Sequence, residues 1–309
     1  MPSYRGISWA AMEAVMQEFH ARLKESFPAF AGIVDRDYAA FGDPWAQAFS
    51  HDLEAMFGPP DDPRWEEAIR GYVLFSLDAL RSQKFFEENG RYKASNYADV
   101  KRDYWDNPEF MLVNYLPGMF TSYYLWPHHY RLLRFYVDDV LPLVGERRPP
   151  HFCEVGTGTA VYSRATLENL PWIRGTGYDI SAHSLTFGAR VLKAFEVDDR
   201  YELEQRDIVA DTPEPTDYLI CQEVLEHLED PVTFVDALTD MVHPGGLAYI
   251  TAAVTAGHSD HIYLFESAQE VRALLERSGF SIVLERTEVA ESANVKEIAP
   301  RVSCFLCER

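Results

Sequence analysis

The sequence has few cysteines, few basic residues and no long apolar run. It holds 28 Lys and Arg against 49 Asp and Glu, a formal net charge of −21. Such a surface repels phosphate backbones and anionic membranes, so neither a nucleic-acid partner nor a membrane partner is expected. No apolar run approaches the ~20 residues needed to span a bilayer, and residues 1–24 lack the apolar stretch of a signal peptide. These absences predict a cytoplasmic protein.

The four cysteines do not suggest a metal or redox pair. Cys153 and Cys221 fall in or at the ends of predicted inner strands, where a free thiol behaves as a small apolar side chain. Cys304 and Cys307 have a CxxC spacing, but residues 302–307 have the pattern of a strand. A strand of that length places the two sulfurs on opposite faces. We therefore expect four unpaired thiols.

The stretch 151–160, HFCEVGTGTA, predicts a strand, a tight turn and the start of a helix near Ala160. The turn carries Gly156 and Gly158, and such turns bring backbone amides close to a nucleotide or sulfonium cofactor. Two glycines alone are a weak signal. The dinucleotide fingerprint also needs a small residue three places after its second glycine. That place is Val161, which argues against NAD and a nucleotide-dependent oxidoreductase.

Polar residues also follow the next predicted strands. Asp179 ends the strand 174–178, Asp207 follows the strand 201–205, and Glu223 follows the strand 217–222. Ligands of open α/β sheets bind beyond the carboxyl ends of the strands. One acid at such a place is best explained as a helix cap. Several at consecutive strand ends favour a binding site.

At these residues the chain resembles the class I S-adenosylmethionine-dependent methyltransferases. Glu154-x-Gly-x-Gly is similar to their first motif, Asp179 to their ribose-binding acid and Asp207 to their adenine-side acid. The stretch 223–231, EVLEHLEDP, resembles the fourth motif of the small-molecule branch, which includes ubiquinone-pathway O-methyltransferases. The resemblance implies S-adenosyl-L-methionine as cofactor. The residues expected to bind it are Glu154, Gly156, Thr157, Gly158, Asp179, Ile180, Asp207, Ile208 and Gln222.

One position departs from the family pattern. Thr159 stands where the family usually has a third glycine. The departure is tolerable if the loop needs a positive φ only at Gly156 or Gly158.

The alternation of strands and helices after residue 150 predicts an α/β fold, a Rossmann-like doubly wound sheet. The resemblance implies seven strands, the last one antiparallel and inserted between the fifth and sixth. Residues 1–149 read as helical, with Pro117 expected to end or kink one helix. We therefore predict a helical N-terminal lid or substrate subdomain (1–149) and a cofactor-binding methyltransferase domain (150–309). The helical part could also mediate a homo-oligomer.

Aromatic and imidazole side chains gather just before the expected catalytic domain. Packing in a helical core explains any single one of them. Their density nevertheless suggests that several line a substrate pocket. The candidates are Tyr115, Tyr123, Tyr124, His128 and His129.

Glu223, Glu226 and His227 stand at i, i+3 and i+4, so a helical turn there would place them on one face. They could bind a divalent metal ion, with His261 added from the stretch 256–263, or act as general base. We take His227 and Glu223 as catalytic candidates. The motif resembles that of plant small-RNA 3′-end methyltransferases, which hold magnesium with Glu-x-x-Glu-His and a later histidine. In other relatives Glu-His needs no metal, and the two groups cap a helix or bond locally.

The leading hypothesis is methyl transfer from S-adenosyl-L-methionine to an O, N or C atom of a small metabolite, in biosynthesis or secondary metabolism. The alternatives are a metal-dependent C- or O-methyltransferase and a non-catalytic cofactor-binding protein of the same fold. Metal analysis separates the first alternative from the leading hypothesis, and cofactor binding without turnover would indicate the second.

Overall fold

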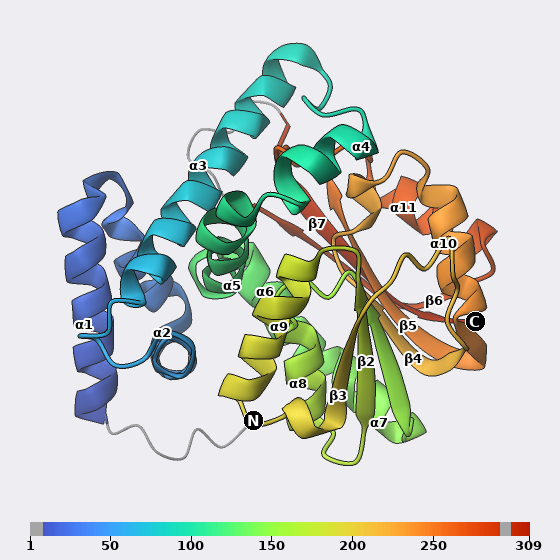
Figure 1. The fold of residues 1–309 in the computed structure, drawn as a ribbon, viewed down its shortest axis with the longest axis horizontal. Coiled ribbons are helices and arrows are strands. Elements are labelled where there is room, and N and C mark those ends of the chain that lie inside the picture. Colours follow the sequence, from blue (N-terminus) through green and yellow to red (C-terminus); the bar gives the residue numbers. More distant parts are fainter. Residues whose placement is uncertain (1–8, 291–297) are drawn as a thin grey trace.

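A seven-stranded sheet forms the C-terminal half of the protein (Figure 1). The structure is a computed structural model that describes residues 9–290 and 298–309. The strands are β1 (His151–Val155), β2 (Arg174–Asp179), β3 (Tyr201–Gln205), β4 (Thr216–Cys221), β5 (Val242–Val254), β6 (Ser281–Val289) and β7 (Arg301–Glu308). Their spatial order is β3-β2-β1-β4-β5-β7-β6.

The sheet topology confirms the predicted fold class. β1 to β5 pair in parallel, and β7 runs antiparallel between β5 and β6. The chain order reverses at β1 and β4, which lie side by side. This reversal opens a crevice at the carboxyl ends of the strands, where such folds bind ligands. β6 runs to Val289 and alternates exposed and half-buried residues, as an edge strand does.

Helices cover both faces of the sheet. α8 (Val161–Asn169) and α9 (Ala182–Ala194) lie on the face turned toward the N-terminal helices, while α10 (Pro231–Asp240) and α11 (Ala268–Arg277) lie on the other (Figure 1). Residues of β7 alternate between the two resulting cores: Cys304 belongs to one and Cys307 to the other. This alternation confirms that the two thiols point to opposite faces, and all four cysteines are unpaired.

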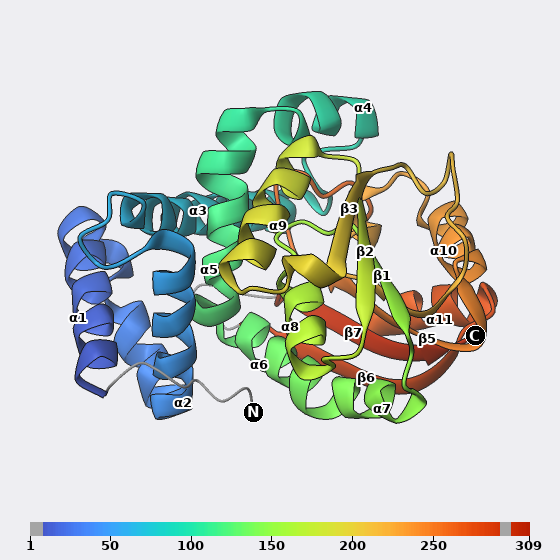
Figure 2. The same ribbon diagram turned by 60° about the horizontal axis from the view of Figure 1, so that its bottom comes forward.

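The N-terminal half is helical, as predicted. Its α-helices are α1 (Trp9–Ser26), α2 (Gly32–Phe57), α3 (Trp65–Asn89), α4 (Tyr97–Val100), α5 (Leu116–Leu125), α6 (Pro127–Phe135) and α7 (Leu141–Arg147). Single wide turns, Lys101–Trp105, Phe110–Tyr115 and Tyr136–Val140, join some of them. α1 and α2 lie at the end of the molecule farthest from α10 and α11 (Figure 2).

Pro117 does not end a helix, one of the two outcomes that the sequence allowed, because α5 continues past it to Leu125. The wide turn Phe110–Tyr115 runs directly into α5 just before Pro117, and a proline inside a helical path removes a backbone hydrogen bond. The chain instead leaves the helical path at Trp126, which has φ −112° and ψ 111°. Pro127 follows it, and a residue before proline is pushed toward the extended region.

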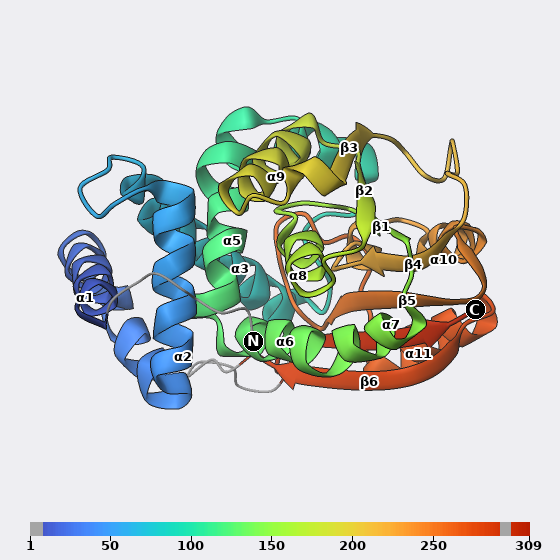
Figure 3. The same cartoon turned by 90° about the horizontal axis from the view of Figure 1, so that it is seen from below.

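The helical part packs against one face of the sheet. α6 and α7 run along β6 and β7 (Figure 3), and one continuous core joins these helices to the sheet. Tyr136 lies in that core: its hydroxyl oxygen accepts a hydrogen bond of 2.8 Å from Tyr218, and its ring centre is 4.8 Å from that of Tyr249. The division at residues 149 and 150 stays a prediction, since this core crosses it.

A buried ion pair also ties the helical part to the sheet part. Asp52 on α2 accepts hydrogen bonds from both terminal nitrogens of Arg164 on α8, one of them 3.0 Å long, and from the Tyr124 hydroxyl. The exposed fractions are 1% for Asp52 and 6% for Arg164. Burial acts to raise the pKa of Asp52, but the Arg164 charge and the hydrogen bonds from His51, Arg164 and Tyr124 together outweigh it, so the net pKa is lowered. No described helix is long and apolar enough to cross a membrane.

We expect Asp52→Ala to lower the free energy of unfolding by about 3–5 kcal/mol, because it leaves the Arg164 charge buried without its partner. Urea unfolding of the purified variant measures this loss. Glu88→Ala is the control, since it removes an exposed 3.9 Å pair with Lys84, and it should change stability by about 0–1 kcal/mol. Equal losses in the two variants would contradict a structural role for the buried pair.

Candidate functional site

A cavity of about 590 Å³ lies at the carboxyl ends of the strands. Its walls come from the glycine loop after β1, the ends of β2 and β4, and helices of the N-terminal half. The cavity is lined by nearly all of the predicted site residues: Tyr115, Tyr123, His128, His129, Glu154, Gly156, Thr157, Gly158, Asp179, Ile180, Asp207, Ile208, Gln222, Glu223, His227 and His261. The fold therefore brings both halves of the predicted site into one space.

The loop after β1 turns through residues with positive φ. Gly156 has φ 72° and Gly158 has φ 50°, as the motif predicts. Thr159 avoids a positive φ, but Ala160 takes one, φ 56°, at the start of α8. The residue with a left-handed backbone is thus Ala160, one place after Thr159, where the family usually has its third glycine. A Cβ atom at Gly156 would lie 2.3 Å from Cγ2 of Val224, so only glycine fits there.

Glu154 is buried at the end of β1 and is held by hydroxyl groups. Ser163 donates a hydrogen bond to its Oε2, and the Tyr201 hydroxyl lies 3.5 Å from the same oxygen. Burial raises the pKa of Glu154 to about 8, although these hydrogen bonds act to lower it. Without a ligand, Glu154 is therefore protonated at neutral pH. Sequence reasoning did not predict the roles of Ser163 and Tyr201.

Asp179 and Asp207 differ in their surroundings. Asp179 is buried and accepts amide hydrogen bonds from Gly158 (3.0 Å) and Ser181 (2.8 Å). Burial raises the pKa of Asp179, and the amides act against that shift. Asp207 is exposed, and its Oδ1 accepts a 3.0 Å hydrogen bond from the amide of Val209. Asp207 thus closes a turn while it lines the cavity.

The other end of the cavity begins at Glu223. Its backbone has φ 46°, and its amide donates to Thr251. The helical turn that follows covers only Leu225–His227. Glu223 is therefore outside the turn, and the expected single face with Glu226 and His227 was wrong. Burial raises the pKa of Glu223 to about 7, and the His258 charge acts to lower it.

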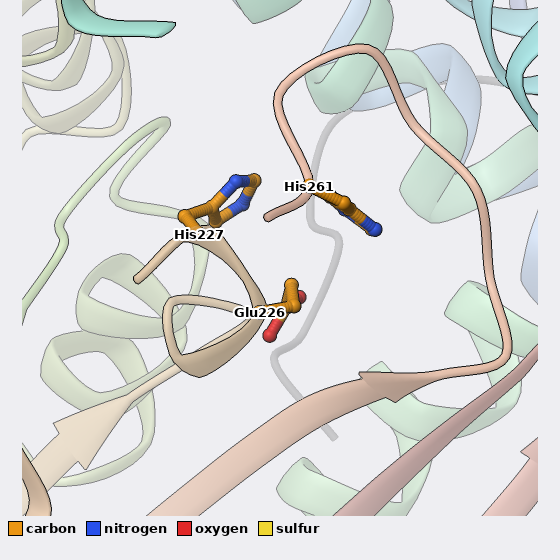
Figure 4. A group of neighbouring side chains, drawn as sticks. All are labelled: Glu226, His227 and His261. Atoms are coloured by element: carbon orange, nitrogen blue, oxygen red, sulfur yellow. The ribbon is translucent and has the colours of Figure 1, made fainter. Parts of the chain in front are cut away.

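Glu226, His227 and His261 form a buried cluster (Figure 4). One potential ligand atom from each lies within 4.8 Å of the others. Glu226 and His227 come from the turn after β4, and His261 comes from the loop after β5. Glu223, which the sequence suggested as a fourth metal ligand, is not part of this cluster.

Asp260 organises the side chains behind this cluster, a role that sequence reasoning missed. Its carboxylate accepts hydrogen bonds from Trp105 Nε1 (3.1 Å) and His258 Nδ1 (2.8 Å), and lies 3.5 Å from His227 Nδ1. Burial acts to raise the pKa of Asp260, but the charges of His227 and His258 hold it far below the usual range. Because Trp105 belongs to the N-terminal half, the bond also ties that half to the loop after β5. No local motif in the sequence signals this contact.

Four of the five predicted pocket aromatics and imidazoles line the cavity, but Tyr124 does not. Its hydroxyl points to Asp52 in the buried ion pair, because the network there needs a donor. His129 accepts or donates a 3.0 Å hydrogen bond with Ser122, and burial lowers its pKa to about 3. Burial also lowers the pKa of His128. The two imidazoles are therefore neutral.

Comparison with known proteins agrees with this geometry. Residues 153–248 match the family model of a methyltransferase domain. Ubiquinone biosynthesis O-methyltransferase of Xylella fastidiosa is 31% identical over 119 residues, which is 38% of this chain and 45% of that protein. The same enzyme of Stutzerimonas stutzeri is 27% identical over 146 residues, which is 46% and 59% of the two chains. Residues 153–248 are therefore similar to a methyltransferase domain, and the comparisons support a class I S-adenosylmethionine-dependent methyltransferase.

Solved structures share the fold of this methyltransferase chain. Mitomycin 7-O-methyltransferase has a TM-score of 0.54 at 15% identity, over 82% of this chain and 74% of that one. PigF with SAH has a TM-score of 0.54 at 14% identity, over 83% and 77%. The first curated relatives match over about 36–59% of their own length. The chain thus spans about half the length of these curated relatives.

Glu154 should make the cofactor-free methyltransferase less stable as pH rises. The side chain has a pKa of 4.5 when unperturbed and about 8 in the fold. Between these values the folded state holds a proton that the unfolded state has lost, so stability falls by up to about 1.4 kcal/mol per pH unit. Glu154→Gln should flatten that dependence, measured by urea unfolding from about pH 5 to pH 8.

Glu202→Gln on β3 is the control, because Glu202 is exposed. It should keep the pH dependence of the unmodified protein. An unchanged slope in Glu154→Gln would mean that Glu154 is already ionised in the fold.

Proposed function

We propose that the protein transfers a methyl group from S-adenosyl-L-methionine to an O, N or C atom of a small metabolite, in small-molecule biosynthesis. The observation that carries this proposal is the shared cavity. The glycine loop and Asp179 line it together with Glu223, His227 and the aromatic wall of the N-terminal half. A donor and an acceptor held in one enclosed space need little further help, because alignment alone removes much of the barrier.

The cofactor would occupy the end formed by β1, β2 and the loop after β3. Asp179 would accept hydrogen bonds from the ribose hydroxyls, as acids at the end of the second strand do in related folds. Ile180, Asp207 and Ile208 would surround the adenine, and the glycine loop with Thr157 and Glu154 would face the methionine part. The neighbour PigF, whose structure contains SAH, supports a cofactor of this type. Gln222 lines the same cavity at the end of β4.

The charge of the site suits a cationic donor. Glu154, Asp179 and Glu223 line the cavity, and burial raises the pKa of each. A sulfonium ion near them would favour their ionised forms. Preorganised negative groups in a site that excludes water stabilise a positive charge more strongly than water does.

The acceptor would occupy the end lined by Tyr115, Tyr123, His128 and His129. The S–CH₃ bond breaks with its electron pair left on sulfur, and a bond forms from the acceptor atom to carbon. The acceptor's proton would pass to Glu223 or His227. Glu223, with a pKa of about 7, suits a general base at neutral pH.

Cavity size supports a small acceptor. About 590 Å³ lies within the range of roughly 300–1,000 Å³ for small-molecule sites, and the cofactor would share it. The net charge of −21 argues against a nucleic acid. A homo-oligomer through the helical part and a cytoplasmic location stay predictions from the sequence.

Two measurements test the proposed function. Calorimetric titration should show one S-adenosyl-L-methionine site per chain. Incubation with hydroxylated aromatic and keto metabolites should then release S-adenosylhomocysteine with at least one acceptor. Binding without turnover on any metabolite extract would indicate a non-catalytic cofactor-binding protein instead.

Asp179→Ala should weaken S-adenosyl-L-methionine binding by about 1–3 kcal/mol, because it removes a charged hydrogen-bonding partner. Asp217→Ala is the control, since Asp217 is exposed near the amino end of β4. Calorimetry should show unchanged affinity for the control. Equal affinity for both variants would remove Asp179 from the ribose site.

A further inference from the structure

Glu226 is a buried carboxylate without a partner. Its side chain has no exposed surface, and neither oxygen has a hydrogen-bond partner among the described residues. Burying a carboxylate unpaired is costly, so such a group either takes up a proton or binds a cation. His227 and His261 are the side chains that could bind the same cation as Glu226 (Figure 4).

Both histidines present a free nitrogen. His227 Nδ1 lies 3.0 Å from the carbonyl oxygen of Asp260, and His261 Nδ1 lies 2.7 Å from that of Ala256. A carbonyl oxygen only accepts, so each Nδ1 carries a proton, and in the neutral imidazole Nε2 keeps its lone pair for an ion. Metal-binding histidines are oriented in this way, with the second nitrogen donating to a carbonyl or carboxylate.

The backbone holds the two halves of the cluster together. The amides of Ile262 and Tyr263 both donate to the carbonyl oxygen of Glu226, at 2.7 and 2.9 Å. These bonds join the loop after β5 to the turn after β4. The ring centres of His227 and His261 are consequently 4.9 Å apart. Backbone hydrogen bonds between the two segments therefore hold the three side chains of the cluster near one another.

His258 lies beside the cluster but is already engaged. Its Nδ1 lies 2.8 Å from Asp260, and its Nε2 lies 3.3 Å from the Asp78 carboxylate. The Nε2 atom faces Asp78 but makes no hydrogen bond, and His258 is not part of the cluster of potential ligand atoms. Glu223 lies outside the cluster as well, which leaves three ligands.

We propose that Glu226, His227 and His261 bind one divalent ion of the zinc type. Two imidazole nitrogens and one carboxylate suit zinc, cobalt, iron or manganese better than magnesium or calcium, which prefer oxygen ligands. Zinc–nitrogen bonds of about 2.0–2.1 Å require ligand atoms about 3.3 Å apart. The potential ligand atoms now lie within 4.8 Å of one another. Side-chain rotations that move these atoms by about 1–2 Å would bring them to zinc-binding distances.

Three protein ligands leave at least one coordination position open. His227 and His261 line the cavity, so that position faces the space assigned to the acceptor. If the proposed function holds, an ion there would polarise an acceptor hydroxyl or keto oxygen. The acceptor would then carry a hydroxyl or keto oxygen that binds the ion. Either this oxygen or an atom next to it would receive the methyl group.

Cobalt(II) titration of the metal-free full-length protein tests the site without any methyl donor. A visible absorption band that saturates at one cobalt per chain, persists in excess magnesium and disappears with zinc is the expected result. The absence of a saturating band would overturn the proposal, as would a band abolished by magnesium at equal concentration.

His261→Ala and Glu226→Gln should each weaken cobalt binding at least 10-fold. Glu223→Gln and His243→Ala are matched controls, because the first is near the site but outside the cluster and the second is an exposed histidine. Both controls should bind cobalt as the unmodified protein does. Circular dichroism checks that each variant is folded, and Glu226→Asp replaces Glu226→Gln if the latter is not. Equal binding in all variants, or loss of binding only in Glu223→Gln, would assign the ion elsewhere.

The two proposals fail separately. Cofactor binding to the metal-free protein with no cobalt site would refute the metal proposal and leave methyl transfer standing. Cobalt binding without any S-adenosyl-L-methionine affinity would refute the proposed function and leave the metal site standing.

Discussion

The site depends on buried carboxylates at one edge of the sheet, which need hydrogen-bond or charge partners to stay buried. Glu154, Asp179, Glu226 and Asp260 are almost fully buried there. Three of them have partners: hydroxyl groups for Glu154, loop amides for Asp179, and an indole with two imidazoles for Asp260. Glu226 alone lacks one among the described residues. Several of these partners, such as Ser163, Gly158 and Trp105, come from other elements than the acid they contact, so satisfying the acids also helps to assemble the cavity.

The helical N-terminal half is part of this assembly. Trp105 donates to Asp260, while Tyr115 and Tyr123 form walls of the cavity. The Asp52–Arg164 pair holds α2 against α8, the helix that follows the glycine loop. These helices thereby form one wall of the space where a sulfonium ion and an acceptor would meet. The distinction between lid and catalytic domain is therefore less sharp than the sequence suggests.

Sequence patterns predicted the fold and most of the residues that line the cavity at the strand ends, for a physical reason. Strand periodicity, the positive-φ glycines and acids at strand ends are local features, and Gly156 and Asp179 follow from them directly. The β7 insertion came from family resemblance. Long-range contacts have no such local signal. Asp260 is joined to Trp105, 155 residues away in sequence, and Tyr124 to Asp52, 72 residues away. Tyr124 was assigned to the pocket for that reason.

The turn after β4 shows a second limit. Glu223, Glu226 and His227 have helical spacing, but Glu223 has φ 46° and the turn is only three residues long. Spacing identifies a shared face only where a helix exists. Two backbone hydrogen bonds, from the amides after His261 to the carbonyl oxygen of Glu226, bring His261 close to Glu226 and His227. That contact changed the candidate metal ligands from four to three.

A crystal structure with S-adenosylhomocysteine bound tests the central claim most directly, namely that one cavity holds both donor and acceptor. The account predicts ribose hydroxyls on Asp179, adenine beside Ile208, and the sulfur facing the space between Tyr123, Glu223 and His227. A ligand bound outside this cavity, or a sulfur facing away from Glu223 and His227, would contradict it.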